Sequence, residues 1–207
     1  MLAMLMLLAM PNPGPDPETA IEAERAFNRA AQTEGQWTAF RKFSTPDAVL
    51  FTPQPAKAHD ILPELRERTP QIAVQWWPAE SYVSCDGMVA VNTGPWVRPK
   101  AVGYFTTVWV RQQDGHFKWV YDGGDTLAMP RALPEKPKVR TAACSPLPPA
   151  VGEVTTLGGT VGRGQSPDGT LRWFWRVDAN GARHFVANLW NGKTFEPVLT
   201  NDIAAPQ

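Results

Sequence analysis

The sequence predicts an α+β fold, in which a curved antiparallel sheet packs on three N-terminal helices and a small β extension follows. Three observations support this prediction. Apolar residues recur at helical spacing near the N-terminus, aromatic strands joined by Asp-Gly turns follow from residue 72, and a proline-rich stretch precedes the last part of the chain. Helices that come before a run of strands are typical of domains whose helices cover one face of a sheet.

The first helix is predicted to begin at Asp16 and Pro17, because a side-chain oxygen can cap a helix and proline fits its first turn. Gly35 favours its end. One narrow apolar stripe runs along it: Ala20, Ala23, Phe27, Ala30 and Ala31.

A second, shorter helix presents Trp37, Phe40 and Phe43 on one side and stops before Pro46. Residues 48–52 are strand-like, and a third helix is predicted to begin at Asp60.

The strands after residue 72 form a meander with tight turns at Asp86-Gly87 and Asp114-Gly115. Strict alternation along the last strand, residues 117–122, predicts that Trp119 and Tyr121 share one face and that Asp122 lies on the other.

Composition divides the chain into four parts. Residues 1–17 are an apolar segment with a Pro-rich spacer, 18–129 form the α+β domain, 130–150 hold six prolines, and 151–207 form the β extension. The extension is too small to fold alone, so we expect it to pack on the domain through its tryptophans. These anchors are Trp173, Trp175 and Trp190.

The charge balance argues against a nucleic-acid partner, because 20 basic and 20 acidic residues cancel and no basic stripe is present. Nine tryptophans indicate a core or a pocket walled by large rings.

The first ten residues, MLAMLMLLAM, are similar to the apolar centre of a secretory signal peptide. They are too short to span a bilayer, which takes about 20 residues. A basic region and an A-x-A cleavage site are missing. We expect export to the periplasm or outside the cell, and the alternative is a cytoplasmic protein with an apolar N-terminus.

The two cysteines, Cys85 and Cys144, allow a disulfide in an oxidising compartment, or two small buried residues in the cytosol. A bridge would close a loop of about 60 residues, which chain-entropy models value at about 4 kcal/mol.

The order of elements, with three stretches of sequence, resembles the nuclear-transport-factor-2-like superfamily and its SnoaL-like, ketosteroid-isomerase-related branch. The stretches are AERAFNRAAQTEGQWTAFRKFSTPDAVLFTP, SCDGMVAVNTGPW and GYFTTVWVRQQDGHFKWVYDGGD, and the likeness covers roughly residues 18–128. It implies a cone-shaped sheet with a pocket at its wide end, and a homodimer through the open face of the sheet.

Ketosteroid isomerases of this fold use a general-base carboxylate, a tyrosine and a protonated acid. The resemblance puts the base at about Thr52, the tyrosine at Phe27 or Asn28, and the second acid at Thr106 or Thr107. None of these residues matches the required side chain, so the isomerase set is absent.

Two acid–base candidates remain. Asp122 ends the aromatic hairpin and could be a base in the pocket, although Asp122 to Asp125 also reads as a solvated turn. His59 precedes Asp60 near the expected opening, where Asp60 is equally explained as a helix cap.

Large aromatic residues on the strands either fill the core or line a pocket for a flat apolar ligand. The candidate ligand-binding residues are Trp76, Tyr82, Trp96, Tyr104, Trp109 and Trp119. The histidines and cysteines show no metal-ligand spacing, so we expect no metal and no cofactor.

The first functional hypothesis is therefore an exported domain that binds a small apolar molecule without evident catalytic residues. The second is an acid–base isomerase, dehydratase or hydrolase acting on a small cyclic substrate. The third is a structural or dimerisation module.

Overall fold

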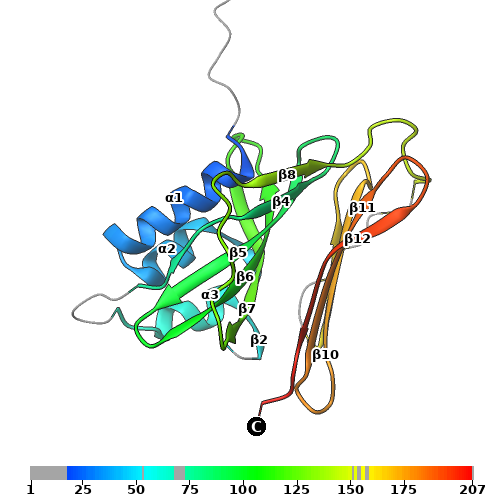
Figure 1. Cartoon of the computed structure of the whole chain (residues 1–207). Helices are drawn as coiled ribbons and strands as arrows, with labels where there is room; N and C mark the ends of the chain where they lie inside the picture. The colour runs from blue at the N-terminus through cyan, green and yellow to red at the C-terminus, as the bar shows by residue number, and fades with distance from the viewer. Residues whose placement is uncertain are drawn as a thin grey trace, which may run out of the picture.

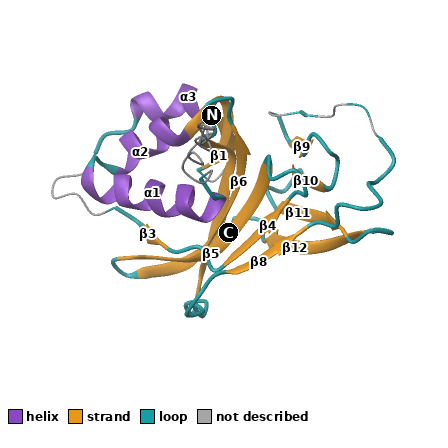
Figure 2. Ribbon diagram, turned by 90° about the horizontal axis from the view of Figure 1, so that it is seen from above, coloured by secondary structure: helices purple, strands orange, loops and turns teal. Residues whose placement is uncertain are grey.

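The computed structural model describes residues 18–52, 54–67, 73–150, 152, 155–156 and 159–206. A large curved sheet lies between two layers (Figure 1). Helices α1 (Ala20–Thr33), α2 (Gln36–Phe43) and α3 (Ala58–Ile61), with the 3-10 helix η1 (Leu62–Glu64), cover one face. A second sheet from the C-terminal part of the chain packs on the opposite face, as Figure 2 shows from above.

Within the described residues, the large sheet has eight strands. Seven follow the order β2-β1-β7-β6-β5-β4-β8, and the eighth, β3, pairs with β5. Its strands are β1 (Ser44–Phe51), β2 (Pro55–Lys57), β3 (Gln75–Trp76), β4 (Glu80–Val83), β5 (Val89–Arg98), β6 (Ala101–Arg111), β7 (Phe117–Leu127) and β8 (Lys138–Thr141).

The sheet is mixed, whereas the sequence predicted an antiparallel one. Strand β1 pairs with β7 in parallel, and so does β4 with β8. Hairpin turns fix the antiparallel direction of neighbouring strands, but these two pairs are joined by long chain segments that leave the direction open.

Two helix starts and one additional strand differ from the prediction. Helix α1 is capped by Thr19, whose hydroxyl accepts from the backbone of Glu22 while Glu22 bonds back, and Asp16 and Pro17 lie outside the described residues. Helix α3 begins at Ala58 rather than Asp60. Strand β8 lies inside the stretch 130–150, which was expected to be only a connection.

The inner core fills the space between the helices and the sheet. Phe27 on α1 lies at its centre, with ring centroids 4.8 Å from Phe40 and 4.7 Å from Trp76. Trp109 and Trp119 are completely buried beside it. The alanines of α1 let the helix approach these rings closely.

The C-terminal sheet has the order β12-β11-β10-β9. Its strands are β9 (Val161–Gln165), β10 (Leu171–Val177), β11 (Arg183–Trp190) and β12 (Phe195–Ile203). Its inward side chains and the outer face of the large sheet form a second apolar core, in which Trp175 meets Phe51 edge-on at 5.1 Å. The sheet face expected to be open for a second copy is therefore covered by the chain itself.

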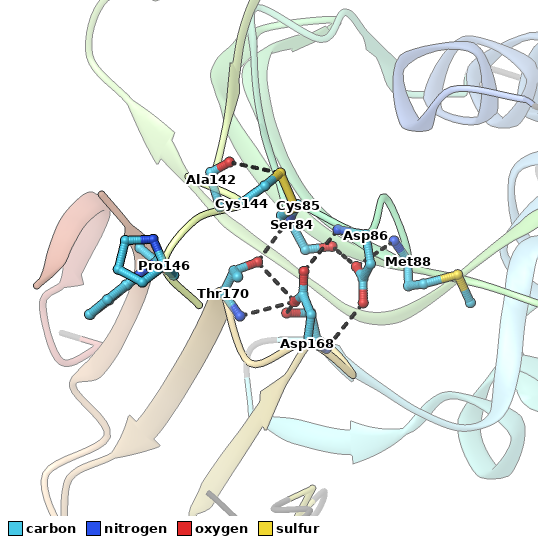
Figure 3. The surroundings of a disulfide bond; sticks show 11 residues. Ser84, Cys85, Asp86, Met88, Ala142, Cys144, Pro146, Asp168 and Thr170 are labelled. Carbon is cyan, nitrogen blue, oxygen red and sulfur yellow. Dashed lines mark hydrogen bonds between the residues drawn. A yellow bond between two sulfur atoms is a disulfide. The ribbon is translucent and has the colours of Figure 1, made fainter. Parts of the chain in front are cut away.

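Two turns with the same Ser-x-Asp-Gly sequence join the two parts, one at residues 84–87 and the other at residues 166–169 (Figure 3). In each turn the serine hydroxyl donates to the aspartate two residues later. The backbone N–H of Asp86 donates to Asp168 Oδ2 at 2.8 Å, and the N–H of Asp168 donates to Asp86 Oδ2 at 3.1 Å. We call this reciprocal contact the turn clasp.

A disulfide between Cys85 and Cys144 lies next to the turn clasp (Figure 3). The backbone N–H of Cys85 also donates to Thr170 Oγ1 at 2.9 Å. The C-terminal part is thus attached at one end by a covalent bond and polar contacts, and along its length by apolar packing.

Candidate functional site

A cavity of about 390 Å³ opens on the helix side of the large sheet, near one end of strands β1, β5, β6 and β7. Its volume is within the range of small-molecule sites. The wall is largely apolar and aromatic, with contributions from Phe27, Phe40, Leu50, Trp76, Trp96 and Phe105.

The two tryptophans of the wall are positioned by strand pairing. Trp76 on β3 lies directly opposite Trp96 on β5, which puts both side chains on one face. Trp96 faces Gly103 on β6, where a Cβ would lie 2.3 Å from the indole ring. Glycine at position 103 is therefore what lets this ring lie flat against the sheet, and Trp96 Nε1 donates to the carbonyl of Tyr104 at 3.0 Å.

A β-bulge directs Asp122 into the cavity. Trp109 pairs with Trp119 and Val108 pairs with Tyr121, so β7 contains one extra residue, Val120. Trp119 lies in the inner core, whereas Val120 and Tyr121 both lie in the outer core. Asp122 therefore returns to the face of Trp119, and the strict alternation predicted from the sequence is wrong at this point.

Asp122 is partly buried, and its Oδ2 accepts a hydrogen bond from Thr107 Oγ1 at 2.8 Å. Burial raises the pKa of its carboxyl to about 8, the hydrogen bond from Thr107 lowers it, and the charge of Glu24 raises it further. At neutral pH this acid is mostly protonated. Among the described residues Oδ1 has no hydrogen-bond partner, which leaves it for a molecule in the cavity.

A second buried acid, Glu24 on α1, supports the wall from behind. Its side chain is completely buried and accepts from Trp76 Nε1 at 2.7 Å, from Trp109 Nε1 at 2.6 Å and from Asn92 Nδ2 at 3.2 Å. Burial raises the pKa of Glu24 to about 7, against these three hydrogen bonds, which lower it. Glu24 thus holds the indole of Trp76 in place.

The sequence analysis missed Glu24, although a signal was available. Position 24 lies four residues after Ala20 and three before Phe27, so it falls on the apolar stripe of the first helix. A lone acid on a buried stripe needs buried partners, and such a position is a reason to look for a functional group.

Charged residues surround the opening of the cavity. Arg98 on β5, Arg183 on β11 and Asp125 on β7 belong to its lining. Arg98 is exposed and lies over the ring of Trp96 at 5.4 Å, and Arg183 lies over Phe51 at 5.8 Å. The C-terminal sheet therefore contributes a cation to a cavity built by the α+β domain.

The six aromatic candidates separate into three groups. Trp76, Trp96 and Tyr104 line the cavity. Trp109 and Trp119 are completely buried in the inner core behind it, where they act as packing. Tyr82 packs on the outer core, with its hydroxyl donating to Glu80 Oε2 at 2.6 Å.

His59 is not brought to the cavity. It is exposed at α3, where its Nε2 lies 2.9 Å from Ser44 Oγ. Its neighbour Asp60 is exposed as well. Of the two catalytic candidates, only Asp122 is part of the cavity lining.

The positions carried over from the isomerases do surround the cavity. Thr52 and Phe27 line it, and Thr107 bonds Asp122 on the neighbouring strand. The resemblance puts an acid at Thr106 or Thr107 on β6. The carboxyl group of this cavity is instead that of Asp122 on β7, which pairs with Thr107.

Within the described part of the chain, no cluster of three or more His, Cys, Asp and Glu side chains could hold a metal ion. In the same residues, no helix is both long and apolar enough to cross a membrane.

No protein-family model and no curated protein matches this chain. A solved structure, described as a nuclear transport factor 2 (NTF2-like) superfamily protein from Salmonella enterica subsp. enterica serovar Typhimurium str. LT2, is similar to it with a TM-score of 0.40 and 15% sequence identity. The similarity covers 53% of this chain and 89% of that chain. The assignment to the SnoaL-like branch stays a prediction.

Proposed function

We propose that this protein binds a small, largely apolar ring molecule in the cavity, with Asp122 donating a hydrogen bond to an oxygen of that molecule. The observation that carries the proposal is the cavity itself: about 390 Å³, walled by aromatic rings, with one carboxyl whose Oδ1 is unpaired among the described residues. Apolar pockets with a few placed polar groups are the usual form of small-molecule sites.

The protonation state of Asp122 supports a neutral contact at this point of the wall. An acid with a pKa of about 8 can donate a hydrogen bond at neutral pH, as a carbonyl or ether oxygen requires. Ionisation would put a charge against the apolar rings, which is unfavourable. Affinity for a neutral ligand should therefore fall as the pH rises through about 8.

Two measurements test this function. Native mass spectrometry of gently purified protein should show bound mass that leaves on denaturation. 6-Propionyl-2-(dimethylamino)naphthalene, a neutral fluorescent ring compound with a carbonyl oxygen, should bind at pH 6 and more weakly at pH 9. Asp122→Asn, which stays neutral, should bind it equally at both values, and the exposed control Asp47→Asn should behave like the natural protein.

Two outcomes would contradict the proposed binding function or the role of Asp122 in it. An apo mass together with no probe binding at either pH would remove the binding function. Binding with the same pH dependence in Asp122→Asn would keep the cavity as a site but exclude Asp122 from ligand contact.

We also propose export to an oxidising compartment. The apolar run at residues 1–10 and the disulfide between Cys85 and Cys144 support it, since such bonds persist outside the cytosol. Thiol labelling in intact cells tests this. Both cysteines should resist labelling until a reductant is added, and labelling without reductant would indicate a cytoplasmic protein.

A second candidate function is acid–base catalysis on a small cyclic substrate. It is favoured by the same carboxyl, because a pKa of about 8 suits proton transfer near neutral pH. Catalysis can be tested by measuring the conversion of cyclohex-3-enone into its conjugated isomer through the rise in ultraviolet absorbance. In that reaction Asp122 would take a proton from the carbon beside the carbonyl and return it two carbons further. Turnover that is lost in Asp122→Asn would support catalysis, and equal rates in both proteins would exclude it.

A further inference from the structure

Two arginines of the cavity lining have no ion-pair partner in the part of the chain that the structure describes. Within these residues, the side chains of Arg98 and Arg183 form no ion pair and no hydrogen bond, and they lie over the rings of Trp96 and Phe51. Guanidinium groups prefer planar anionic partners, which they bind through two parallel hydrogen bonds.

Arg183 is the better placed of the two. It is only partly exposed, at the first position of β11. Burial raises the pKa of Tyr104 to about 12 and also raises that of Tyr121, and the positive charge of Arg183 opposes both shifts. Arg183 and Tyr104 belong to the lining of the same cavity.

Two carboxylates of the C-terminal part are paired with His184, and the third, Asp125, stays in the cavity lining. His184 Nδ1 lies 2.6 Å from Asp202 Oδ1, and His184 Nε2 lies 2.9 Å from Asp178 Oδ2. Asp125 on β7 lines the cavity, but its Oδ1 accepts from the backbone of Thr126. A third arginine, Arg131, lies over the ring of Tyr104 at 3.7 Å.

Positive charge exceeds negative charge around the lining. Arg98, Arg183 and Asp125 line the cavity, and Arg131 lies over the ring of Tyr104. Asp202, whose charge also acts on Tyr104, is paired with His184, and Asp122 is mostly protonated at neutral pH. An apolar cavity with a cationic opening matches a molecule with an apolar body and one anionic end.

We propose that Arg183 recognises an anionic group, such as a carboxylate, on the ligand, so that the natural ligand is an amphipathic organic anion. This inference rests on the proposed binding function. It also gives the C-terminal sheet a role in ligand selection, because the recognition residue comes from β11 and the rest of the cavity from the α+β domain.

A pair of probes with the same ring skeleton tests the inference. 8-Anilinonaphthalene-1-sulfonate is anionic, and N-phenyl-1-naphthylamine is its neutral counterpart. In Arg183→Gln, Kd for the anionic probe should rise about tenfold, as expected for a lost charge-assisted hydrogen bond, while Kd for the neutral probe stays within about twofold. Arg183→Lys keeps the charge but not the paired N–H groups, so it should recover only part of the anion affinity. Arg163→Gln on the edge strand β9 is the matched control.

The outcomes separate the two proposals. If both probes bind and Arg183→Gln changes neither, recognition of an anion by Arg183 is wrong and the cavity is still a binding site. If Arg183→Gln weakens both probes equally, the arginine only supports Phe51, and the inference is wrong as well. Val74→Trp places a bulky ring on the cavity wall and should weaken both probes. If it changes neither, the probes bind elsewhere, and both proposals are wrong.

Discussion

The two faces of the large sheet are both apolar, but they are used differently. The outer face meets a second sheet, and its side chains interdigitate with Trp173, Trp175 and Phe185. The inner face meets helices that close over it incompletely and leave a cavity. The two acids whose pKa burial raises to between about 7 and 8, Glu24 and Asp122, are both on the inner side.

One sheet can therefore contribute to stability through its outer face and, through its inner face, to the ligand binding that we propose. A sheet packed on a sheet presents two regular surfaces that fit closely, whereas a few short helices on a strongly curved sheet cannot fill its wide end. Changes at the outer face should therefore alter stability and leave binding unchanged, and changes at the inner face should alter binding and its pH dependence.

The largest effect is expected from Trp175→Ala. The side chain is completely buried between the sheets, and its loss should lower the free energy of unfolding by about 3–5 kcal/mol. Urea denaturation followed by circular dichroism measures this. Under conditions where the variant stays folded, its affinity for N-phenyl-1-naphthylamine should be unchanged, and a large loss of affinity would mean that the two faces are not independent.

Removing the disulfide should have the next largest effect. Cys85→Ser with Cys144→Ser should lower the free energy of unfolding by about 2–4 kcal/mol, because the unfolded chain loses a constraint across a sequence separation of 59 residues. The natural protein with a reductant present is the control. Equal stability of all three forms would show that the turn clasp and the apolar packing suffice.

The pH dependence of stability tests the inner face. Glu24 has a pKa of about 7 in the folded protein against 4.5 as its ordinary value, so its contribution is fully present below pH 4.5 and is lost as the pH rises to about 7. The expected loss is roughly 3 kcal/mol between pH 4.5 and 8. Asp122 acts in the same direction up to a pH of about 8.

Urea denaturation at pH 5 and pH 8 in an Asp122→Asn background isolates the contribution of Glu24. Adding Glu24→Gln should flatten the remaining dependence, whatever it does to absolute stability. If the free energy of unfolding still falls between pH 5 and pH 8 after this change, a group other than Glu24 is responsible.

The smallest effect concerns the turn clasp. Asp168→Ala removes acceptors for the N–H groups of Asp86 and Thr170 and should lower the free energy of unfolding by about 1–2 kcal/mol. Asp86→Ala should do the same. Each alanine variant keeps its own backbone N–H and removes one of the two reciprocal bonds, so the double variant should lose roughly the sum of both. A double-variant loss close to that of either single variant would mean that removing one bond already opens the whole clasp.

The class of fold, the order of the helices and the hairpin turns could be predicted from the sequence. These depend on local signals: apolar spacing, Asp-Gly pairs and proline-rich breaks. The sequence also put Trp76, Trp96, Tyr104 and Asp122 among the candidate site residues, and these four belong to the cavity lining.

Only the tertiary structure decided which side each group faces and what surrounds it. One extra residue in β7 moves Asp122 to the inner face, and a single bulge leaves no mark in the alternation of FKWVYD. Glu24 and Arg183 lie far apart in the chain, and only the fold brings Glu24 against Trp76 of the cavity wall and Arg183 into the cavity lining. Burial and partner geometry, which set charge state and contact, are properties of the folded arrangement and not of the local sequence.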